Sequence, residues 1–180
     1  MKSVLIPLID GFEEIEAVTA IDILRRAGLN VTTAGVGKRS ATGSHQITVS
    51  TDALLDEISS GTYDLILLPG GPGTKALGEV TALQGMLKRQ AHGGLPIAAI
   101  CAAPTIPAKL GILEGKRATC FPAVESQMAG AQLSHYPVVV DDRIITSRGA
   151  GTAVPFALAV VELLLGRDRS QSLAREIVYQ

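Results

Sequence analysis

The sequence predicts a doubly wound α/β fold with a mostly parallel central sheet. Short, wholly apolar runs alternate along the chain with longer segments in which apolar residues recur at helical spacing. The composition, 47% hydrophobic and 18% charged with 19 glycines, is typical of a compact α/β protein. A chain of 180 residues is long enough for one substantial core, so we expect a single domain over residues 1–180.

Four segments are expected to form the parallel strands, and all except 30–35 are mainly apolar runs, as burial on both faces requires. They cover residues 3–9, residues 30–35, residues 63–69, and a run that begins at Leu95 and has Cys101 at its end. Segments 138–140 and 144–146 flank the turn residues 141–143 and predict a hairpin. Segment 38–50 is less regular and indicates an excursion or an antiparallel ribbon.

Helical spacing is clearest in residues 12–27. Ile15, Val18, Ile21 and Leu24 recur every three residues, and Gly28 follows as a stop signal. Further helices are expected at 54–59, 74–91, 105–110, 122–128, 153–165 and 170–178. The segment 149–152 is interpreted as the cap of the helix over 153–165, because it lacks the lysine and the glycine spacing of phosphate-binding loops.

Composition excludes several classes of protein. The net charge of −1 provides no general attraction for polyanions, so no obligate nucleic-acid partner is expected. Two cysteines make neither a disulfide framework nor a zinc motif, which favours a reducing, cytoplasmic location and no metal. The apolar run at 4–9 is too short for a signal peptide, and the longest uncharged stretch, 95–108, is short of a membrane span.

Cys101 is the first candidate for chemistry. It follows a predicted central strand and precedes Pro104, which opens a helix. A thiol on such a turn faces unpaired backbone N–H groups, which favour the thiolate, so we expect a lowered pKa. The alternative is that Cys101 is a small buried hydrophobe, and the residues alone leave both interpretations open.

Glu16 is the second candidate. On a helical wheel it lies among Phe12, Ala20, Ile23 and Ala27, so one carboxyl group interrupts an apolar stripe. A buried carboxyl without a partner tends to keep its proton, and a protonated Glu16 would donate a hydrogen bond to a thiolate. The alternative is that Glu16 caps backbone N–H groups or reaches solvent past Ala20.

Backbone donors are expected near the sulfur. Gly70 and Gly71 follow a strand directly, and with the N–H of Ala102 they would form an oxyanion pocket, although a glycine pair is more often a tight turn. The three histidines, His45, His92 and His135, do not assemble a Cys–His pair from sequence. The latter two are interpreted as surface residues, and His45 lies in the irregular segment.

Five short motifs occur in order: GFEEIE at 11–16, DILRRAG at 22–28, LPGG at 68–71, AAICAAP at 98–104 and TSRG at 146–149. Together they resemble the ThiJ/PfpI superfamily from residue 3 to about residue 166. The most similar branch is that of the parkinsonism-associated deglycase and its bacterial YajL-like relatives. The resemblance implies a flavodoxin-like three-layer sandwich, a homodimer, and a cysteine on a strained nucleophile elbow.

The resemblance also implies roles for four residues. Cys101 matches the family's oxidation-prone cysteine, Glu16 the acid that hydrogen-bonds it, and Gly71 and Ala102 the backbone donors of the anion pocket. Because Ala102 stands where peptidase members carry a histidine, peptidase activity is not expected.

Other matched positions are less regular. Phe121 stands where some members place a histidine near the cysteine, and Arg26 and His45 match positions at an interface or pocket. Ala150 replaces a common proline, and Cys120 is a weak candidate for a resolving thiol.

These observations predict a cysteine-dependent glyoxalase or deglycase without a cofactor or metal. Its substrates would be methylglyoxal-type dicarbonyls or their early protein adducts, in protection against carbonyl and oxidative stress. The alternative is a non-catalytic redox sensor or chaperone that operates through oxidation of Cys101. A flavin-binding flavodoxin is disfavoured because the chain has only three phenylalanines and three tyrosines, and no tryptophan.

Overall fold

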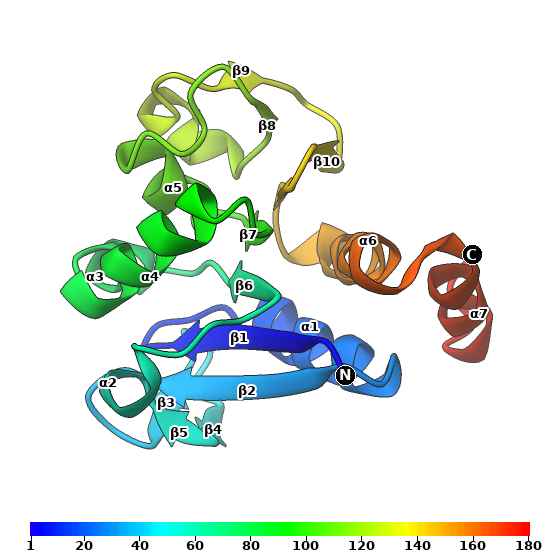
Figure 1. Cartoon of the computed structure of the whole chain (residues 1–180), viewed down its shortest axis with the longest axis horizontal. Coiled ribbons are helices and arrows are strands. Elements are labelled where there is room, and N and C mark those ends of the chain that lie inside the picture. Colours follow the sequence, from blue (N-terminus) through cyan, green and yellow to red (C-terminus); the bar gives the residue numbers. More distant parts are fainter.

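The computed structural model describes residues 1–180, and its centre is a seven-stranded sheet (Figure 1). The strand order is β10-β11-β7-β6-β1-β2-β5, and every neighbouring pair is parallel except β10 and β11. The strands are β1 (Ser3–Leu8), β2 (Asn30–Gly35), β5 (Ala53–Leu54), β6 (Leu65–Leu68), β7 (Ile97–Ile100), β10 (Val138–Asp141) and β11 (Ile144–Ser147). These pairings confirm the predicted mostly parallel sheet and the predicted hairpin, β10 with β11, at the edge of the sheet.

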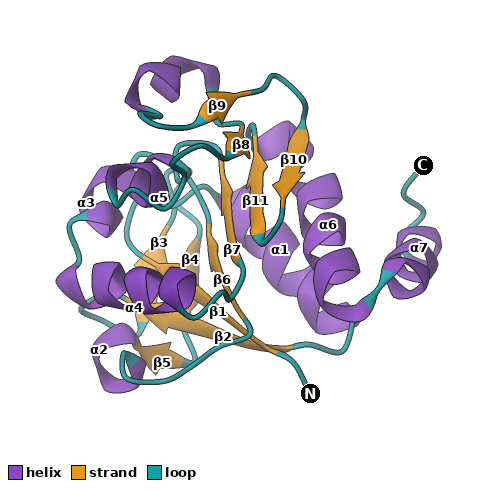
Figure 2. Ribbon diagram, turned by 45° about the horizontal axis from the view of Figure 1, so that its top comes forward, coloured by secondary structure: helices purple, strands orange, loops and turns teal.

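Helices cover both faces of this sheet (Figures 1 and 2). One layer consists of α1 (Glu14–Arg26), α6 (Ala153–Leu165) and α7 (Arg167–Glu176). The other layer consists of α2 (Leu55–Ile58), α3 (Thr74–Gly78), α4 (Thr81–His92) and α5 (Thr105–Lys109). The protein therefore has the three layers of a flavodoxin-like sandwich, as predicted.

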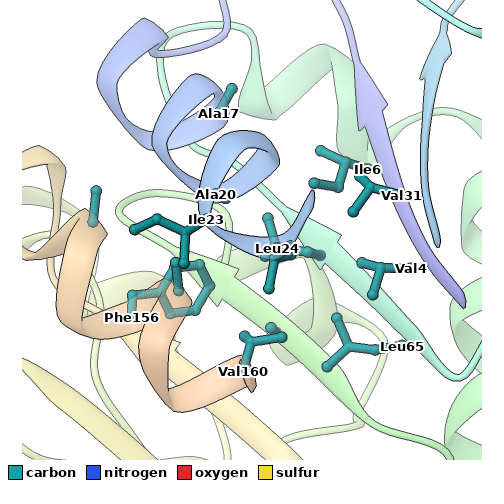
Figure 3. Close-up of a cluster of buried hydrophobic side chains, with 14 of the residues drawn as sticks. Val4, Ile6, Ala17, Ala20, Ile23, Leu24, Val31, Leu65, Phe156 and Val160 are labelled. Carbon is teal, nitrogen blue, oxygen red and sulfur yellow. The ribbon is translucent and has the colours of Figure 1, made fainter. Parts of the chain in front are cut away.

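Alternation along the strands produces two separate cores. Val4 and Ile6 of β1 pack in the core under α1 and α6, whereas Leu5 between them packs in the core under the opposite layer. Figure 3 shows the first core, where Phe156 of α6 faces Ile23 of α1. Because every central strand is buried on both faces, its sequence is a continuous apolar run rather than an alternating one.

The structure corrects two predicted helices. The helix expected over 74–91 is interrupted, because Gly78 ends α3 and the extended Val80 precedes α4. Glycine and β-branched valine are poor helix formers, and the Gln84 side chain donates to the Gly78 carbonyl at 2.7 Å, which satisfies the end of α3. The helix expected over 122–128 is the 3₁₀ helix η1 (Pro122–Gln127), which proline begins.

Smaller elements complete the chain. Segment 38–50 contains the predicted antiparallel ribbon, β3 (Ser40–Thr42) with β4 (Thr48–Ser50), which forms its own sheet. A parallel pair, β8 (Arg117–Ala118) with β9 (Gln132–Leu133), and the 3₁₀ turn η2 (Ala150–Thr152) were not predicted as such. None of the helices combines the length and the apolar composition needed to cross a bilayer.

The parallel strands place the candidate residues at one edge of the sheet. The chain leaves β1, β6 and β7 at their carboxyl ends, and the loops that follow contain the start of α1, the pair Gly70 and Gly71, and Cys101. Ligand sites in open parallel sheets lie beyond these strand ends. The sheet order thus brings together three segments that are distant in sequence.

Candidate active site at the carboxyl edge of the sheet

Cys101 occupies a strained turn directly after β7. Its φ angle is +65°, in the left-handed region that residues other than glycine rarely adopt. Two backbone hydrogen bonds hold it there: its N–H donates to the Ser147 carbonyl at 2.9 Å, and its carbonyl accepts from the Phe121 N–H at 2.8 Å. The half-buried thiol is therefore fixed between β11 and the segment that leads into η1, which confirms the expected elbow.

Glu16 is buried beside this turn. Its side chain is 1% exposed and lies in the first turn of α1, among the apolar residues that the helical wheel predicted. Glu13, not Glu16, caps the helix, since its carboxylate accepts from the Glu16 N–H at 2.8 Å. The interpretation of Glu16 as a cap or a solvent-exposed residue is therefore wrong.

The two oxygens of Glu16 have different surroundings. Oε2 accepts a hydrogen bond from the Gly70 N–H at 2.8 Å, whereas Oε1 is buried and has no hydrogen-bond partner in the chain. Burial raises the pKa of Glu16 to about 7, against the lowering effects of hydrogen bonds with the Gly70 N–H and with the Cys101 thiol.

Gly70 lies in the narrow space between the carboxyl and the thiol. A Cβ atom at this position would be 2.6 Å from the Cys101 Cβ, 2.7 Å from the Glu16 Oε2 and 2.9 Å from the Ile100 carbonyl oxygen. All three distances are below van der Waals contact, so a larger residue would force the two side chains apart. The φ angle of Gly70 is not in the left-handed region. Glycine is therefore needed here because space is limited, and not because of its backbone conformation.

Gly71 and Ala102 supply the backbone donors near the sulfur. The N–H groups of both residues donate toward Cys101, and each acts to lower its pKa. The Thr74 hydroxyl donates to the Gly71 carbonyl at 2.8 Å, and the Thr105 hydroxyl donates to the Ala102 carbonyl at 2.7 Å. These two contacts hold the peptides that follow the donors. The donor peptides themselves are fixed by their own carbonyls: the Gly70 carbonyl accepts from the Glu13 N–H at 2.9 Å, and the Cys101 carbonyl accepts from the Phe121 N–H at 2.8 Å.

The expected lowering of the Cys101 pKa is wrong. Burial, followed by the negative charge of Glu16, raises the pKa of the thiol to about 12, which outweighs the two N–H donors. The helix α5 begins only at Thr105 and has five residues, so its dipole is small. The repulsion by Glu16 exists only while Glu16 is ionised; a protonated Glu16 would instead donate to the thiolate.

Three further residues suggested by the resemblance lie at different places. Phe121 is 45% exposed and adjoins the elbow through its backbone. Arg26 is at the far end of α1, where it pairs with Asp22 at 2.7 Å. His45 lies in the loop between β3 and β4, and its Nδ1 is 3.0 Å from the Glu14 Oε2.

The Glu14–His45 pair is a structural contact. Although burial alone would raise the pKa of Glu14, hydrogen bonds from the His45 imidazole and from backbone N–H groups hold it at about 2. Three potential metal-ligand atoms, one each from Glu13, Glu14 and His45, lie within 4.8 Å of one another. Both carboxylates already accept hydrogen bonds from the chain, so this grouping has an explanation without a metal.

The remaining histidines and the second cysteine lie outside the constellation. His92 is exposed at the end of α4, and His135 is 3.5 Å from Glu125. No histidine is among the groups that shift the pKa of Cys101. Cys120 is 1% exposed in the core under α4 and α5, where burial raises its pKa to about 11, so it is protonated and shielded.

Sequence reasoning missed the residues that organise the donors. The separate roles of Gly70 and Gly71, and the carbonyl contacts of Thr74 and Thr105, were not predicted. The only local signal is a threonine three residues after each donor, a spacing at which a hydroxyl reaches back to a carbonyl.

Comparisons with known proteins identify relatives of this chain. A family model described as "DJ-1/PfpI family" matches residues 2–163. "Protein DJ-1 homolog B" of Arabidopsis thaliana is 43% identical over 175 residues, which cover 96% of this chain and 40% of that protein. "Glutathione-independent glyoxalase DJR-1.2" of Caenorhabditis elegans is 38% identical over 176 residues, covering 97% of this chain and 94% of that protein.

A solved structure shows the same architecture. The crystal structure of Drosophila melanogaster DJ-1beta superimposes with a TM-score of 0.96 at 39% identity, covering 99% of this chain and 98% of that chain. Both the sequence match and the fold extend over nearly the whole chain. On this evidence, the chain belongs to the DJ-1/PfpI family.

Proposed function

We propose that this protein is a cysteine-dependent glyoxalase or deglycase that needs no cofactor. The observation that carries the proposal is the buried Glu16 carboxyl beside a thiol on a strained turn, where each group shifts the pKa of the other. Such a pair can exchange one proton between acid and nucleophile. The name of the Caenorhabditis elegans relative supports the same class of reaction.

The proposed substrate is a 2-oxoaldehyde such as methylglyoxal. The Cys101 thiolate adds to the aldehyde carbon, and the oxygen that becomes negative is stabilised by the N–H groups of Gly71 and Ala102 before it is protonated. Glu16 then moves the proton from the former aldehyde carbon to the neighbouring carbonyl carbon, while the hydroxyl proton passes to the former ketone oxygen, which gives a thioester of the 2-hydroxy acid. Water hydrolyses the thioester and regenerates the thiol, so the aldehyde carbon is oxidised, the ketone carbon is reduced, and the product is lactate.

The same addition to an early adduct on a protein amine or thiol would be observed as deglycation. No leaving-group acid of the peptidase type stands next to the cysteine, since that position is Ala102. We therefore propose dicarbonyls and their adducts, rather than peptides, as the substrate class.

The experiment is lactate formation from methylglyoxal without added glutathione. We expect turnover by the wild type, none by Cys101→Ser, and a loss of about 100-fold or more in Glu16→Gln. Cys120→Ser is the matched control for loss of a thiol and is expected to keep wild-type turnover. Absence of turnover in a wild-type protein with a reduced Cys101 would contradict the proposal.

A redox sensor is the second candidate, favoured by one observation. The half-buried Cys101 lies beside two backbone donors that would equally well hold oxygen atoms on an oxidised sulfur. In that case mild peroxide adds one or two oxygen atoms to Cys101 and changes the binding of partner proteins, while methylglyoxal is not consumed. Mass spectrometry of Cys101 together with the lactate assay separates the two functions.

We also propose that the protein is a homodimer through the outer face of α1. Ile15 and Val18 are 56% and 43% exposed on this helix, and Arg26 lies on the same surface. Apolar side chains exposed together on a helix favour an interface. Light scattering of the wild type and of Val18→Glu tests this, with dimer expected for the former and monomer for the latter.

A further inference from the structure

A polar cavity adjoins the elbow: its lining includes the two donor residues, Gly71 and Ala102, but not Cys101 itself. It has a volume of about 600 Å³ and lies between α3, α5 and η1. Helices α3 and α5 lie side by side in both views (Figures 1 and 2). A three-carbon dicarbonyl fills only a small part of such a volume, which is in the range of cavities that hold much larger ligands.

Two lysines from different helices reach this cavity. Lys75 belongs to α3 and Lys109 to α5, and both are exposed. Neither forms an ion pair in the chain, whereas Lys2, Lys38 and Lys116 all pair with aspartates. The cavity therefore has two ammonium groups available, one from each of these helices.

One carboxylate offsets these charges. Glu79, which directly follows α3, also lines the cavity and has no ion-pair partner. The remaining walls contain mainly small or neutral side chains, so the ionised groups leave one net positive charge. The cavity is therefore suited to a negatively charged group.

We propose that this cavity binds an anionic tail of the substrate, a carboxylate or phosphate-type group joined by a short chain to the dicarbonyl that reacts at Cys101. The inference rests on the proposed function and names the substrate class of the same site. In the overall reaction a 2-oxoaldehyde and one water give a 2-hydroxy acid, and the tail is not changed. Lys75 and Lys109 would then determine specificity without taking part in the chemistry.

The first test measures recognition of the tail without requiring turnover. Cys101 is alkylated by iodoacetamides whose nitrogen carries a three-carbon chain ending in a carboxylate, a phosphonate or a neutral methyl ester. The sulfur displaces iodide in each case, so the three reagents differ only in the tail. Mass spectrometry gives the rate of modification at Cys101 for each reagent.

We expect the wild type to react about tenfold faster with the better of the two anionic reagents than with the ester. The double variant Lys75→Gln with Lys109→Gln is expected to lose this preference, and Glu79→Gln to increase it. Lys88→Gln removes an exposed lysine on α4 outside the cavity and is expected to keep the wild-type ratio. The comparison of carboxylate with phosphonate shows which anion the cavity prefers.

A ratio near one in the wild type, or a ratio that survives the double substitution, would overturn the inference. Methylglyoxal turnover of the wild type is measured in parallel, with Lys88→Gln, which lies outside the cavity, as the variant expected to keep it. Loss of turnover in the wild type would refute the proposed function, while the alkylation ratio would still decide the role of the cavity. The two failures are thus distinguishable.

Discussion

Replacing Glu16 with glutamine removes a buried carboxyl group whose ionisation should destabilise the folded protein. Glu16 is 1% exposed, and its pKa is raised from an ordinary value of 4.5 to about 7, chiefly by burial. Between these two pH values the folded state keeps the proton on Glu16 and the unfolded state has lost it. The free energy of unfolding therefore falls as the pH rises through this window.

The size of the effect follows from the two pKa values. At about 1.36 kcal/mol per pH unit, a rise from 4.5 to about 7 corresponds to about 3 kcal/mol. This contribution is absent below pH 4.5, where both states are protonated, and is complete above pH 7. The free energy of unfolding of Glu16→Gln minus that of the wild type should therefore increase by about 3 kcal/mol from pH 4.5 to pH 8.

Urea unfolding at a fixed protein concentration, from pH 4.5 to pH 8, provides the measurement. Subtracting the two curves removes the titration of every other group. Repeating the comparison in a Cys101→Ala background excludes the thiol as the source. Glu162→Gln, which removes an exposed carboxylate on α6, is the control and should give a flat difference. A flat difference for Glu16→Gln would refute the argument that this carboxyl is held neutral.

Three other substitutions test the packing around the site. Gly70→Ala should cost about 1–3 kcal/mol of stability and slow methylglyoxal turnover, because the new Cβ collides with both reacting side chains; Gly151→Ala, where a Cβ meets nothing within 4 Å, is its control. Thr105→Val should lower turnover about threefold to tenfold and stability by about 1 kcal/mol, because it removes the hydroxyl that donates to the Ala102 carbonyl. Thr105→Ser should restore both, and kinetics and urea unfolding provide the measurements. Phe156→Ala should lower the free energy of unfolding by about 3–5 kcal/mol while the folded fraction keeps its turnover, and an unchanged urea midpoint would contradict the packing in Figure 3.

Much of the fold could be predicted because its central strands are buried on both faces. Runs such as 3–8 and 65–68 have to be apolar throughout, so their composition alone indicates parallel strands. Two-residue strands such as Ala53–Leu54 have no such pattern, since tertiary contacts alone define them. The break after Gly78 was missed for a related reason: the apolar spacing continues through it, and only the tertiary structure shows the extended Val80 and the Gln84 contact with Gly78.

The site was predictable where one residue contradicts its own local pattern. Glu16 stands in an apolar stripe, and Cys101 ends an apolar strand, so each is unusual without reference to any other part of the chain. The contacts of Gly70 and Thr105 depend on how loops from different strands meet, which sequence spacing does not determine. The pKa of Cys101 was predicted in the wrong direction because the turn was considered without the carboxyl that packs against it.

The proposed chemistry also explains why a buried acid and a buried thiol are placed together. With one shared proton, the pair carries a single negative charge, either on Glu16 or on Cys101. Addition to a carbonyl moves that charge from sulfur to oxygen, near the N–H groups of Gly71 and Ala102. The net charge of the site stays the same at each step, so the chain does not have to bury an additional charge during the reaction. A fixed pair of donors is enough for this, and the backbone hydrogen bonds from Glu13 to the Gly70 carbonyl and from Phe121 to the Cys101 carbonyl keep that pair in place.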